Sequence, residues 1–331
     1  MADTLRIGLL GAARITPKAV CDPAHVIPRV RLEGVAARDK RRAAEFAELH
    51  RVHQVFDSYE PLLESPDIDL IYNPLPINRH AEWTIRALEA GKHVLCEKPF
   101  AMNAGEAKEM QAAAGKAGKR LIEAFHYRYH PAFQQCLDWI EAGRIGTVRE
   151  IEADFCVEIR DSDDEIRQLP ETGGGAMMDL GCYPLSWTLQ ALGEAPISVE
   201  AEATLTRRGV DESLTATLGF ESGAVAKLST SMAPGTPFKA AMTIAGSKGR
   251  IHFEKPIFPH RGGHLRLETE NGGHEEATIS PISTYTWQLA AVLDALHTDT
   301  PLPTEGAVIQ TQQTQLDAIY EAAGLRHLRD R

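Results

Sequence analysis

A glutamate and a lysine, both able to take part in catalysis or binding, stand beside a proline at the end of a short apolar run. The segment GKHVLCEKPF at 91–100 places Glu97, Lys98 and Pro99 directly after the run His93–Cys96. Such a run is typical of a buried parallel strand, and open α/β sheets bind ligands at the edge where the carboxyl ends of their strands lie. We therefore predict that this carboxylate and this ammonium group serve a ligand site.

A second candidate site follows the first apolar run, Leu5–Leu10, where a doubly wound fold receives a pyrophosphate on a helix amino end. The residues expected to contact it are Gly11, Ala12, Ala13, Arg14 and Ile15. A GxGxxG pattern starting at Gly11 would have glycine at 13 and glycine or alanine at 16, but the chain has Ala13 and Thr16. The added methyl groups predict either weaker binding or a reshaped turn.

The residues that follow the next apolar run, Val30–Ala37, could determine whether the protein prefers NAD or NADP. At this place an acidic residue would hold the ribose 2′-hydroxyl, whereas an arginine would hold a 2′-phosphate. Both types occur, as Arg38 and Asp39, and Lys40, Arg41 and Arg42 follow. Because the planar guanidinium suits a phosphate, we predict NADP, with NAD the less favoured cofactor, and assign Arg38, Asp39 and Arg42 to it. At least one of Arg41 and Arg42 is expected on a solvated helix face.

The elements that must position these residues alternate along the first third of the chain. The apolar runs predicted as strands are Leu5–Leu10, Val30–Ala37, Ile68–Tyr72, His93–Cys96 and Arg120–Ala124. The segments predicted as helices between them are Ala43–His50, His80–Ala90 and Ala104–Gly118. Strands that alternate with helices in this way predict a doubly wound parallel sheet.

The rhythm changes around Pro131. A helix is predicted at Ala132–Ala142, and two more close the chain at Tyr285–His297 and Glu305–Ala323. The alternating segments predicted as strands are Val148–Ile159, Ile197–Thr206, Ser213–Phe220 and Ala224–Ser231. This pattern is typical of a largely antiparallel sheet. We therefore predict an α/β protein with a Rossmann domain at 1–125 and an α+β substrate domain with an open sheet at 126–331.

Composition excludes several classes of protein. The chain has 331 residues, 43% of them apolar and 24% charged, and a net charge of −11, which argues against nucleic acid or an anionic membrane as the main partner. No apolar run is long enough to span a membrane, and the amino end does not resemble a signal peptide, so we expect a cytoplasmic protein. The five cysteines lack any CxxC spacing, which predicts reduced, mostly buried thiols.

Taken together, these motifs resemble those of the Gfo/Idh/MocA oxidoreductases. The segments that carry the resemblance are GLLGAARI, NPLPINRHAEWTIRALEAGKHVLCEKPF, GGGAMMDLGCYPLSW at 173–187 and TPLPTEG. The stretches VAARDKRRAAEFA and EAF are most similar to the branch of dihydrodiol dehydrogenases and NADP-dependent D-xylose dehydrogenases. That branch carries an arginine where this chain has Arg38, which supports the choice of NADP.

The resemblance implies a site made by both domains. It implies reversible hydride transfer between the nicotinamide and a carbinol carbon of a sugar or cyclic polyol. The residues that it assigns to the cofactor are Asn73, Pro74, Leu75, His80, Glu97, Lys98 and Pro99, and those that it assigns to the substrate are Tyr127, Arg128, Lys98, Asp179 and Tyr183. It also implies a homodimer or homotetramer formed through the exposed face of the second sheet.

Oxidation of a carbinol requires a base for the hydroxyl proton. The resemblance places this function at Tyr183, where many relatives have histidine. A phenol titrates near pH ~10, so Tyr183 could serve near neutrality only if a cation such as Lys98 lowered its pKa. We predict Lys98, Tyr183 and Asp179 as the catalytic residues, with Lys98 polarising the substrate oxygen.

The surroundings of these residues leave several local alternatives. Asp179 and Tyr183, at i and i+4, would share a helix face, but Pro184 requires that the helix begin near Asp179 or bend beyond it. Asp179 could equally cap that helix. A cis Lys98–Pro99 bond would suit a strand-end proline beside a catalytic lysine.

Other features are assigned to structure or left open. His126 and His130 have metal-like spacing without a third ligand, so we predict no metal, and three further histidines are expected in exposed hairpin loops: His260, His264 and His274. The acidic run 161–165 is interpreted as a solvated loop, with a mobile lid as the alternative. The substrate stays open between an aldose, a cyclic polyol or ketose, and a dihydrodiol. Rival functions are a redox sensor without turnover and a sugar–sugar oxidoreductase that retains its cofactor.

Overall fold

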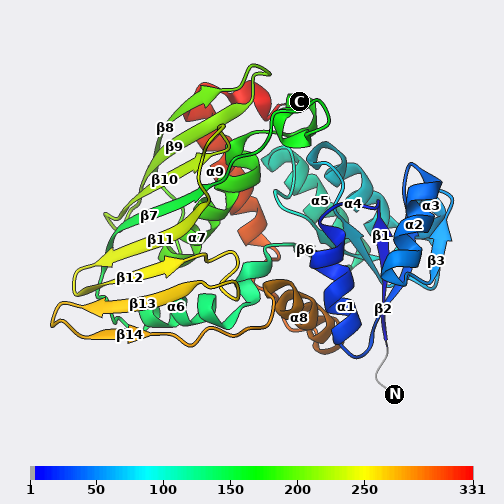
Figure 1. Cartoon of the computed structure of the whole chain (residues 1–331), viewed down its shortest axis with the longest axis horizontal. Helices are drawn as coiled ribbons and strands as arrows, with labels where there is room; N and C mark the ends of the chain where they lie inside the picture. The colour runs from blue at the N-terminus through cyan, green and yellow to red at the C-terminus, as the bar shows by residue number, and fades with distance from the viewer. Residues whose placement is uncertain (1–3, 331) are drawn as a thin grey trace. The chain divides into compact units, whose positions relative to one another are not determined.

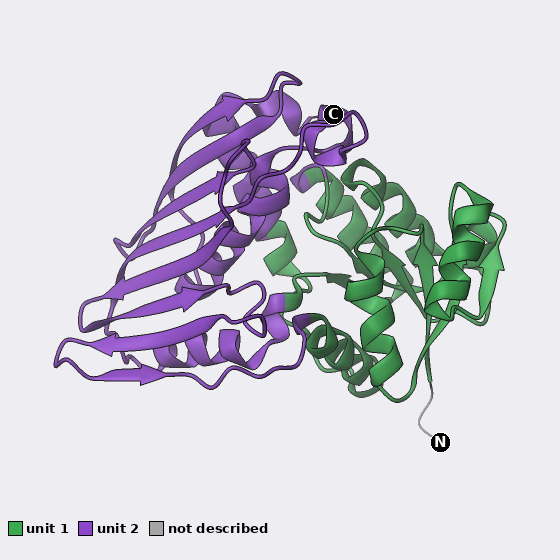
Figure 2. Cartoon of the chain, in the orientation of Figure 1, with its two compact units in different colours: residues 1–101, 105–126, 285–310 green, residues 102–104, 127–284, 311–331 purple. Residues whose placement is uncertain are grey.

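The computed structural model describes residues 4–330, which form two compact units (Figure 2). The first unit consists of 1–101, 105–126 and 285–310, and the second of 102–104, 127–284 and 311–331. Each unit has its own sheet, and each is described by itself. In the described part of the chain, no helix has both the length and the apolar character needed to cross a membrane.

The first unit contains a six-stranded parallel sheet in the order β3-β2-β1-β4-β5-β6 (Figure 1). Its strands are β1 (Leu5–Leu10), β2 (Val30–Ala36), β3 (Gln54–Phe56), β4 (Leu70–Asn73), β5 (His93–Cys96) and β6 (Leu121–Glu123). This order is that of the doubly wound dinucleotide-binding fold, as predicted. The strand order reverses between β1 and β4, so ligands are expected at the carboxyl ends of these strands and of β5.

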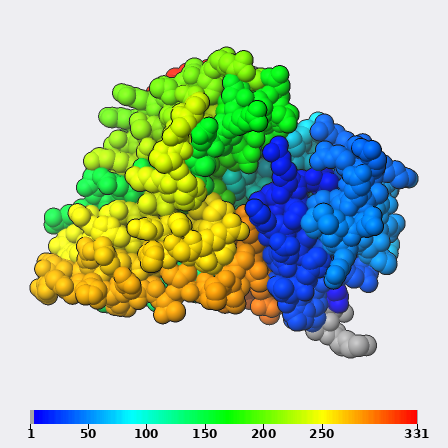
Figure 3. Space-filling view, viewed as in Figure 1, coloured from blue at the N-terminus to red at the C-terminus, as the bar shows by residue number. Residues whose placement is uncertain are grey.

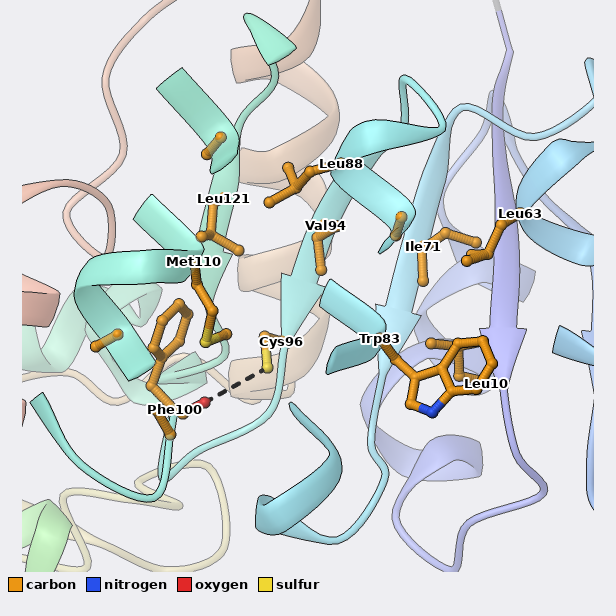
Figure 4. Packing of buried hydrophobic residues seen from close by; sticks show 14 of the residues in the cluster. Leu10, Leu63, Ile71, Trp83, Leu88, Val94, Cys96, Phe100, Met110 and Leu121 are labelled. Atoms are coloured by element: carbon orange, nitrogen blue, oxygen red, sulfur yellow. Dashed lines mark hydrogen bonds between the residues drawn. The ribbon is translucent and has the colours of Figure 1, made fainter. Parts of the chain in front are cut away.

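The first unit also contains, wholly or for the most part, a set of helices. They are α1 (Asp22–Val26), α2 (Lys40–His50), α3 (Tyr59–Glu64), α4 (His80–Glu89), α5 (Ala104–Ala117) and α8 (Thr284–Thr298). The apolar faces of α3, α4 and α5 enclose one core with the strands, to which β1, β4 and β5 contribute Leu10, Ile71 and Val94 (Figure 4). Burial of these side chains is the main source of stability for the sheet edge that carries the candidate site.

The second unit contains an eight-stranded sheet in the order β14-β13-β12-β11-β7-β10-β9-β8. Its strands are β7 (Val148–Cys156), β8 (Ser198–Leu205), β9 (Asp211–Gly219), β10 (Val225–Ser231), β11 (Lys239–Gly246), β12 (Gly249–Glu254), β13 (His264–Thr269) and β14 (His274–Glu276). Only the pair β7 and β10 is parallel among these neighbours, so the predicted open, largely antiparallel sheet is confirmed.

Helices cover one face of this second sheet (Figure 1). They are α6 (Pro131–Glu141), α7 (Cys182–Leu192) and most of α9 (Ala307–Ala322). Along β7 the residues Ile151, Ala153 and Phe155 are buried while Glu152 between them is exposed, which is the alternation expected of a sheet covered on one side. The segments of β12–β14, yellow to orange in Figure 3, cover a continuous part of the unit's surface.

The chain returns to the first unit after the second sheet, which differs from the single boundary predicted between residues 125 and 126. Arg120 holds the returning segment: its guanidinium pairs with Glu305 at 2.6 Å and donates to the carbonyl oxygens of Ala295 and Thr300. The N–H of Glu123 in β6 also donates to Thr304 O at 3.0 Å. Residues 285–310 therefore belong with the Rossmann sheet.

Candidate functional site

The turn after β1 depends on Gly11. Its φ is +82°, its N–H donates to Ala36 O at 2.7 Å, and a Cβ here would lie 3.3 Å from a methyl group of Leu75. The chain then closes a tight turn, since the N–H of Thr16 donates to Ala13 O at 3.1 Å, and continues as a π-helical turn at Pro17–Cys21 before α1. The predicted contact residues beyond Gly11 are at least partly accessible: Ala12, Ala13, Arg14 and Ile15.

The cations after β2 divide into two groups. Lys40 pairs with Asp57, and Arg41 pairs with Glu45 at 3.6 Å on the surface of α2. Arg38 and Arg42, in contrast, have no carboxylate partner among residues 4–330, and Arg42 donates to Ala12 O at 3.4 Å, which places it beside the β1 turn. These two guanidinium groups are therefore available to an anionic ligand.

Asp39 has a capping role that sequence analysis did not assign. One carboxylate oxygen, Oδ1, accepts the backbone N–H groups of Arg41 and Arg42 at 2.9 and 3.3 Å and so caps α2. Burial raises the pKa of nearby Tyr59, whereas the charge of Arg38 lowers it. The positive charge of Arg38 thus acts on Tyr59, whose hydroxyl would lie 3.7 Å from a Cβ added at Gly11.

The loop after β4 is held by two buried side chains, Asn73 and His80. The Asn73 amide donates to Thr84 Oγ1 at 3.0 Å and to His80 O, and its oxygen accepts from the N–H of Leu75. The His80 ring lies between Leu75 O, 2.7 Å from Nε2, and the carbonyl oxygens of Pro99 and Phe100, each 3.2 Å from Nδ1. Both side chains are thus engaged by the protein itself, while Pro74 is buried beside them and Leu75 is half-buried.

Burial lowers the pKa of His80 to about 4, although hydrogen bonds to three backbone carbonyl oxygens raise it. The ring is therefore neutral at physiological pH and carries one N–H. It joins the loop after β4 to the segment after β5.

The EKP segment follows β5 at the same sheet edge. Glu97 is buried and accepts the hydroxyl of Tyr72 at 2.7 Å through Oε1 and the N–H of Lys98 at 3.2 Å through Oε2. The Lys98–Pro99 peptide bond is cis, which is the alternative that the sequence left open. Lys98 itself is half-buried and Pro99 is buried. Tyr72 was not predicted; its signal is a polar side chain at the end of an apolar strand.

In the second unit, Tyr183 lies within a cluster of aromatic rings. Its ring centroid is 5.6 Å from that of Phe155, 6.0 Å from Tyr127 and 6.3 Å from Trp187. Tyr127 is fully buried and donates to Ser186 Oγ at 2.8 Å. The structure thus brings together two of the predicted substrate residues, Tyr127 and Tyr183.

Arg128 follows directly in the chain and is half-buried. Its guanidinium lies 6.0 Å from the ring centroid of Phe133, close enough for a cation–π contact.

Asp179 forms an ion pair that the sequence did not predict. Its carboxylate accepts Arg167 Nε at 2.7 Å, and Arg167 also pairs with Glu165 at 2.9 Å. These two carboxylates raise the pKa of Arg167, so it stays charged. The loop position of Arg167 gives no periodic signal, which is why sequence analysis missed it. Asp179 offers no side-chain cap to its helix; Asp211 accepts the N–H of Met177 instead, at 2.6 Å.

The helix that carries Asp179 and Tyr183 changes type along its length. A π-helical turn at Met177–Gly181 leads directly into α7, so that Pro184 falls in the first turn of α7. Proline is tolerated there because the π-helical turn just before it interrupts the regular i to i−4 hydrogen bonding that a proline would break. Asp179 thus lies in the π-helical turn and Tyr183 in the first turn of α7, in one continuous helical run.

The acidic run 161–165 is anchored to the second unit. Asp161 pairs with Arg207 at 2.6 Å and with Arg208 at 3.0 Å, and Asp163 also pairs with Arg208. Asp161 is exposed whereas Glu165 is buried. The run is thus a mostly solvated loop tied to neighbouring arginines.

The remaining histidines are dispersed. His126 packs on Tyr285 at 4.0 Å, whereas His130 caps α6 through Ala132 N. His264 and His274 are exposed as predicted but begin strands, and His260 is half-buried rather than exposed, with burial lowering its pKa to about 4. Within residues 4–330 no group of three or more His, Cys, Asp or Glu could hold a metal ion.

A cavity of about 460 Å³ in the first unit lies away from these residues. It is lined by Thr4, Leu5, Arg6, Asp69, His93, Leu296 and His297. The strand residues among them stand at the amino ends of β1, β4 and β5, opposite to the edge that carries Gly11 and Glu97. The cavity is therefore separate from the candidate cofactor edge.

The described cysteines are free, and four of the five are buried, as predicted: Cys21, Cys96, Cys136 and Cys182. Burial raises the pKa of Cys21 and Cys136 to about 12, so these thiols are not nucleophiles.

Known proteins share both units of this chain. Residues 5–125 match the model described as the oxidoreductase family with an NAD-binding Rossmann fold, and residues 133–252 match the GFO/IDH/MocA C-terminal domain. A D-xylose 1-dehydrogenase (NADP(+)) of Haloferax volcanii is 33% identical over 96% of this chain and 97% of its own. A trans-1,2-dihydrobenzene-1,2-diol dehydrogenase of Xenopus tropicalis is 38% identical over 68% of this chain and 67% of its own.

Solved structures agree with this relationship. A 3-ketoreductase from Actinomadura kijaniata in complex with NADP and TDP-benzene has a TM-score of 0.86 at 26% identity and covers 97% of this chain and 98% of its own. An aldose-aldose oxidoreductase from Caulobacter crescentus shares the fold, with a TM-score of 0.89 at 24% identity over the same shares of the two chains. The chain belongs to the Gfo/Idh/MocA family of NAD(P)-dependent oxidoreductases.

Proposed function

We propose that the chain is an NADP-dependent dehydrogenase that oxidises a carbinol carbon of a sugar or related cyclic polyol and catalyses the reverse reduction. The relationship to the NADP-dependent D-xylose dehydrogenase, over almost the whole of both chains, carries this proposal. Dihydrodiols are the alternative substrate class, because the dihydrodiol dehydrogenase is 38% identical over a shorter stretch.

The residues at the carboxyl edge of the first sheet suit NADP. Arg38 and Arg42 lack carboxylate partners among the described residues, and a 2′-phosphate would supply the anion that they lack. Asp39 uses only Oδ1 for its capping bonds, so Oδ2 can accept a ribose hydroxyl. The turn at Gly11 leaves room for a pyrophosphate because no side chain projects from its Cα.

The nicotinamide accepts or returns the hydride when NADP is bound. We propose that Tyr183 takes the hydroxyl proton in oxidation and returns it in reduction, while Lys98 polarises the substrate oxygen and favours the phenolate. Arg167 would keep Asp179 charged and fixed beside this proton carrier, since it pairs with that carboxylate at 2.7 Å. Tyr127 and Arg128 would contact the substrate.

An absorbance assay tests this function. The purified protein is mixed with NADP or NAD and with D-xylose, other aldoses, cyclic polyols or trans-1,2-dihydrobenzene-1,2-diol, and reduced nicotinamide is followed in the near ultraviolet. Turnover of a sugar with NADP supports the proposal. Cofactor binding without turnover of any compound favours a sensor, and nicotinamide that stays with the protein through dialysis favours a sugar–sugar oxidoreductase.

We further propose that the protein works in the cytoplasm as a homodimer or homotetramer. The second sheet supports the oligomer, because β7 and its neighbours bury one face and leave the other open. Light scattering coupled to size-exclusion chromatography measures the state directly; a monomer at micromolar concentration would contradict this proposal.

A further inference from the structure

The side chain of Tyr72 is fully buried, and its hydroxyl donates a hydrogen bond to Glu97, the residue that follows the adjacent strand. Tyr72 lies in β4, opposite Leu95 of β5, and its side chain has no exposed surface. It donates to Glu97 Oε1 at 2.7 Å. A hydroxyl buried with a charged acceptor makes a strong hydrogen bond, and removal of the donor leaves the carboxylate incompletely paired.

Glu97 links Tyr72 to the backbone of Lys98 because its carboxylate forms a hydrogen bond with each. Its second oxygen, Oε2, accepts the N–H of Lys98 at 3.2 Å, and its own N–H donates to Asn73 O at 3.0 Å. The carboxylate is therefore fixed between Tyr72 in β4 and the peptide group of Lys98, which follows β5. Rotation of the Glu97 side chain would break both bonds at once.

The segment that follows Lys98 is anchored separately. The carbonyl oxygen of Phe100 lies 3.9 Å from Cys96 Sγ, and the Phe100 ring is fully buried in the core (Figure 4). Tyr72 and Glu97 hold the chain at the N–H of Lys98, whereas the buried Phe100 anchors the chain two residues later. The main chain around Lys98 is therefore held by buried groups on both sides.

Tyr72 cannot itself exchange protons near neutrality. Burial raises its pKa well above the ordinary value, and the charge of Glu97 raises it further. The hydroxyl thus stays protonated and remains a donor throughout the pH range of an assay. Its contribution is one of geometry.

We propose that Tyr72 is a positioning residue that, through Glu97, fixes the main chain at Lys98 for hydride transfer. The inference rests on the proposed function to the extent that Lys98 acts on the substrate. Catalytic groups tolerate little displacement: a shift of about 1 Å can lower a rate by about 100-fold. Neither contact with the substrate nor contact with the cofactor is required of Tyr72.

The variant Tyr72→Phe keeps the ring and removes only the hydroxyl. Its control is His93→Gln, which alters a half-buried residue at the amino end of β5, the strand that Glu97 follows; there His93 Nδ1 accepts the N–H of Arg120 at 3.0 Å. Hydrogen exchange followed by mass spectrometry needs no substrate. We expect amide exchange in 93–101 to become at least about fivefold faster in Tyr72→Phe, with the sheet of the second unit unchanged. The control should lack this effect at 97–101.

Steady-state kinetics give the second measurement, with NADP and D-xylose or trans-1,2-dihydrobenzene-1,2-diol. We expect kcat to fall about tenfold, with KM and the NADPH Kd within about twofold, and a larger isotope effect for substrate deuterated at the oxidised carbon, because hydride transfer becomes slower. Loss of folded protein alone would lower kcat without changing the isotope effect.

The outcomes separate the two proposals. Wild-type exchange in 93–101, wild-type kcat, or an NADPH Kd that rises as much as kcat falls would each overturn the positioning role, the last in favour of cofactor binding. If the wild-type protein turns over none of the compounds, the proposed function fails, and the exchange measurement alone decides whether Tyr72 fixes the Lys98 segment.

Discussion

At the scale of single residues, we predict that Arg38 determines the preference for NADP over NAD. It is exposed and lacks a carboxylate partner among residues 4–330. We expect Arg38→Ala to weaken NADP binding about tenfold and to leave NAD binding within about twofold, because only NADP has a 2′-phosphate for the guanidinium. Fluorescence titration with NADPH and NADH measures both constants.

Arg41 provides the matched control for this prediction. It stands three residues further along the chain, in α2, and pairs with Glu45, so Arg41→Ala should change neither constant by more than about twofold. If Arg38→Ala weakens the binding of NADPH and NADH equally, Arg38 does not bind the 2′-phosphate.

Tyr183 is the residue on which the proposed acid–base chemistry depends. We expect Tyr183→Phe to lower kcat by about 100-fold or more, because general acid–base groups contribute about 10²–10⁴ to rates. Cofactor affinity should stay within about twofold, since the ring that packs on Phe155 and Trp187 is retained. Near-normal turnover of the preferred substrate would exclude Tyr183 as the base.

At the scale of elements, Asp211 supports the helical run that carries Asp179 and Tyr183. It accepts the N–H of Met177 and the hydroxyl of Tyr320, and burial raises its pKa to about 6. A Cβ at Gly175 would collide with its carboxylate, so only glycine allows this approach. The π-helical turn is thus fixed at its start by a buried acid.

The raised pKa makes this support dependent on pH. Because the folded protein holds the Asp211 proton more tightly than the unfolded chain, this group contributes most stability below about pH 4 and loses it as pH rises through about 6. Between pH 4.5 and pH 7 the free energy of unfolding should fall by about 2 kcal/mol relative to Asp211→Asn, which does not titrate. Urea unfolding of both proteins at pH 4.5–7 measures the difference; parallel curves would contradict it.

At the scale of the whole chain, Arg120 holds the segment 285–310 to the Rossmann sheet. Its side chain and that of Glu305 are 14% and 17% exposed. We expect Arg120→Ala to lower the free energy of unfolding by about 3 kcal/mol, because it leaves a nearly buried carboxylate unpaired. Urea denaturation measures this change.

The pair of Arg144 and Glu275 offers a comparison for that prediction. These side chains are 42% and 49% exposed, so Arg144→Ala should cost less than about 1 kcal/mol. Similar losses from both variants would mean that Arg120 does not hold the returning segment.

Elements with strong periodicity were predicted well from sequence. The strands β1, β2 and β5 and the helices α6 and α8 lie within two residues of their expected ends, because apolar spacing and capping residues act locally. The short strand Gln54–Phe56 and the strands β11–β14 were not predicted. Their burial comes from neighbours distant in sequence rather than from their own pattern.

The sequence by itself determined the doubly wound Rossmann fold and the family, because these follow from local patterns and motifs. It allowed a cis bond before Pro99, which the structure shows. Only the tertiary structure decided which cations after β2 are paired, that Arg167 holds Asp179, and that Tyr72 holds Glu97. The physical reason is that hydrogen bonds and ion pairs depend on distances of about 3 Å between side chains far apart in the chain, and no spacing along the sequence encodes them.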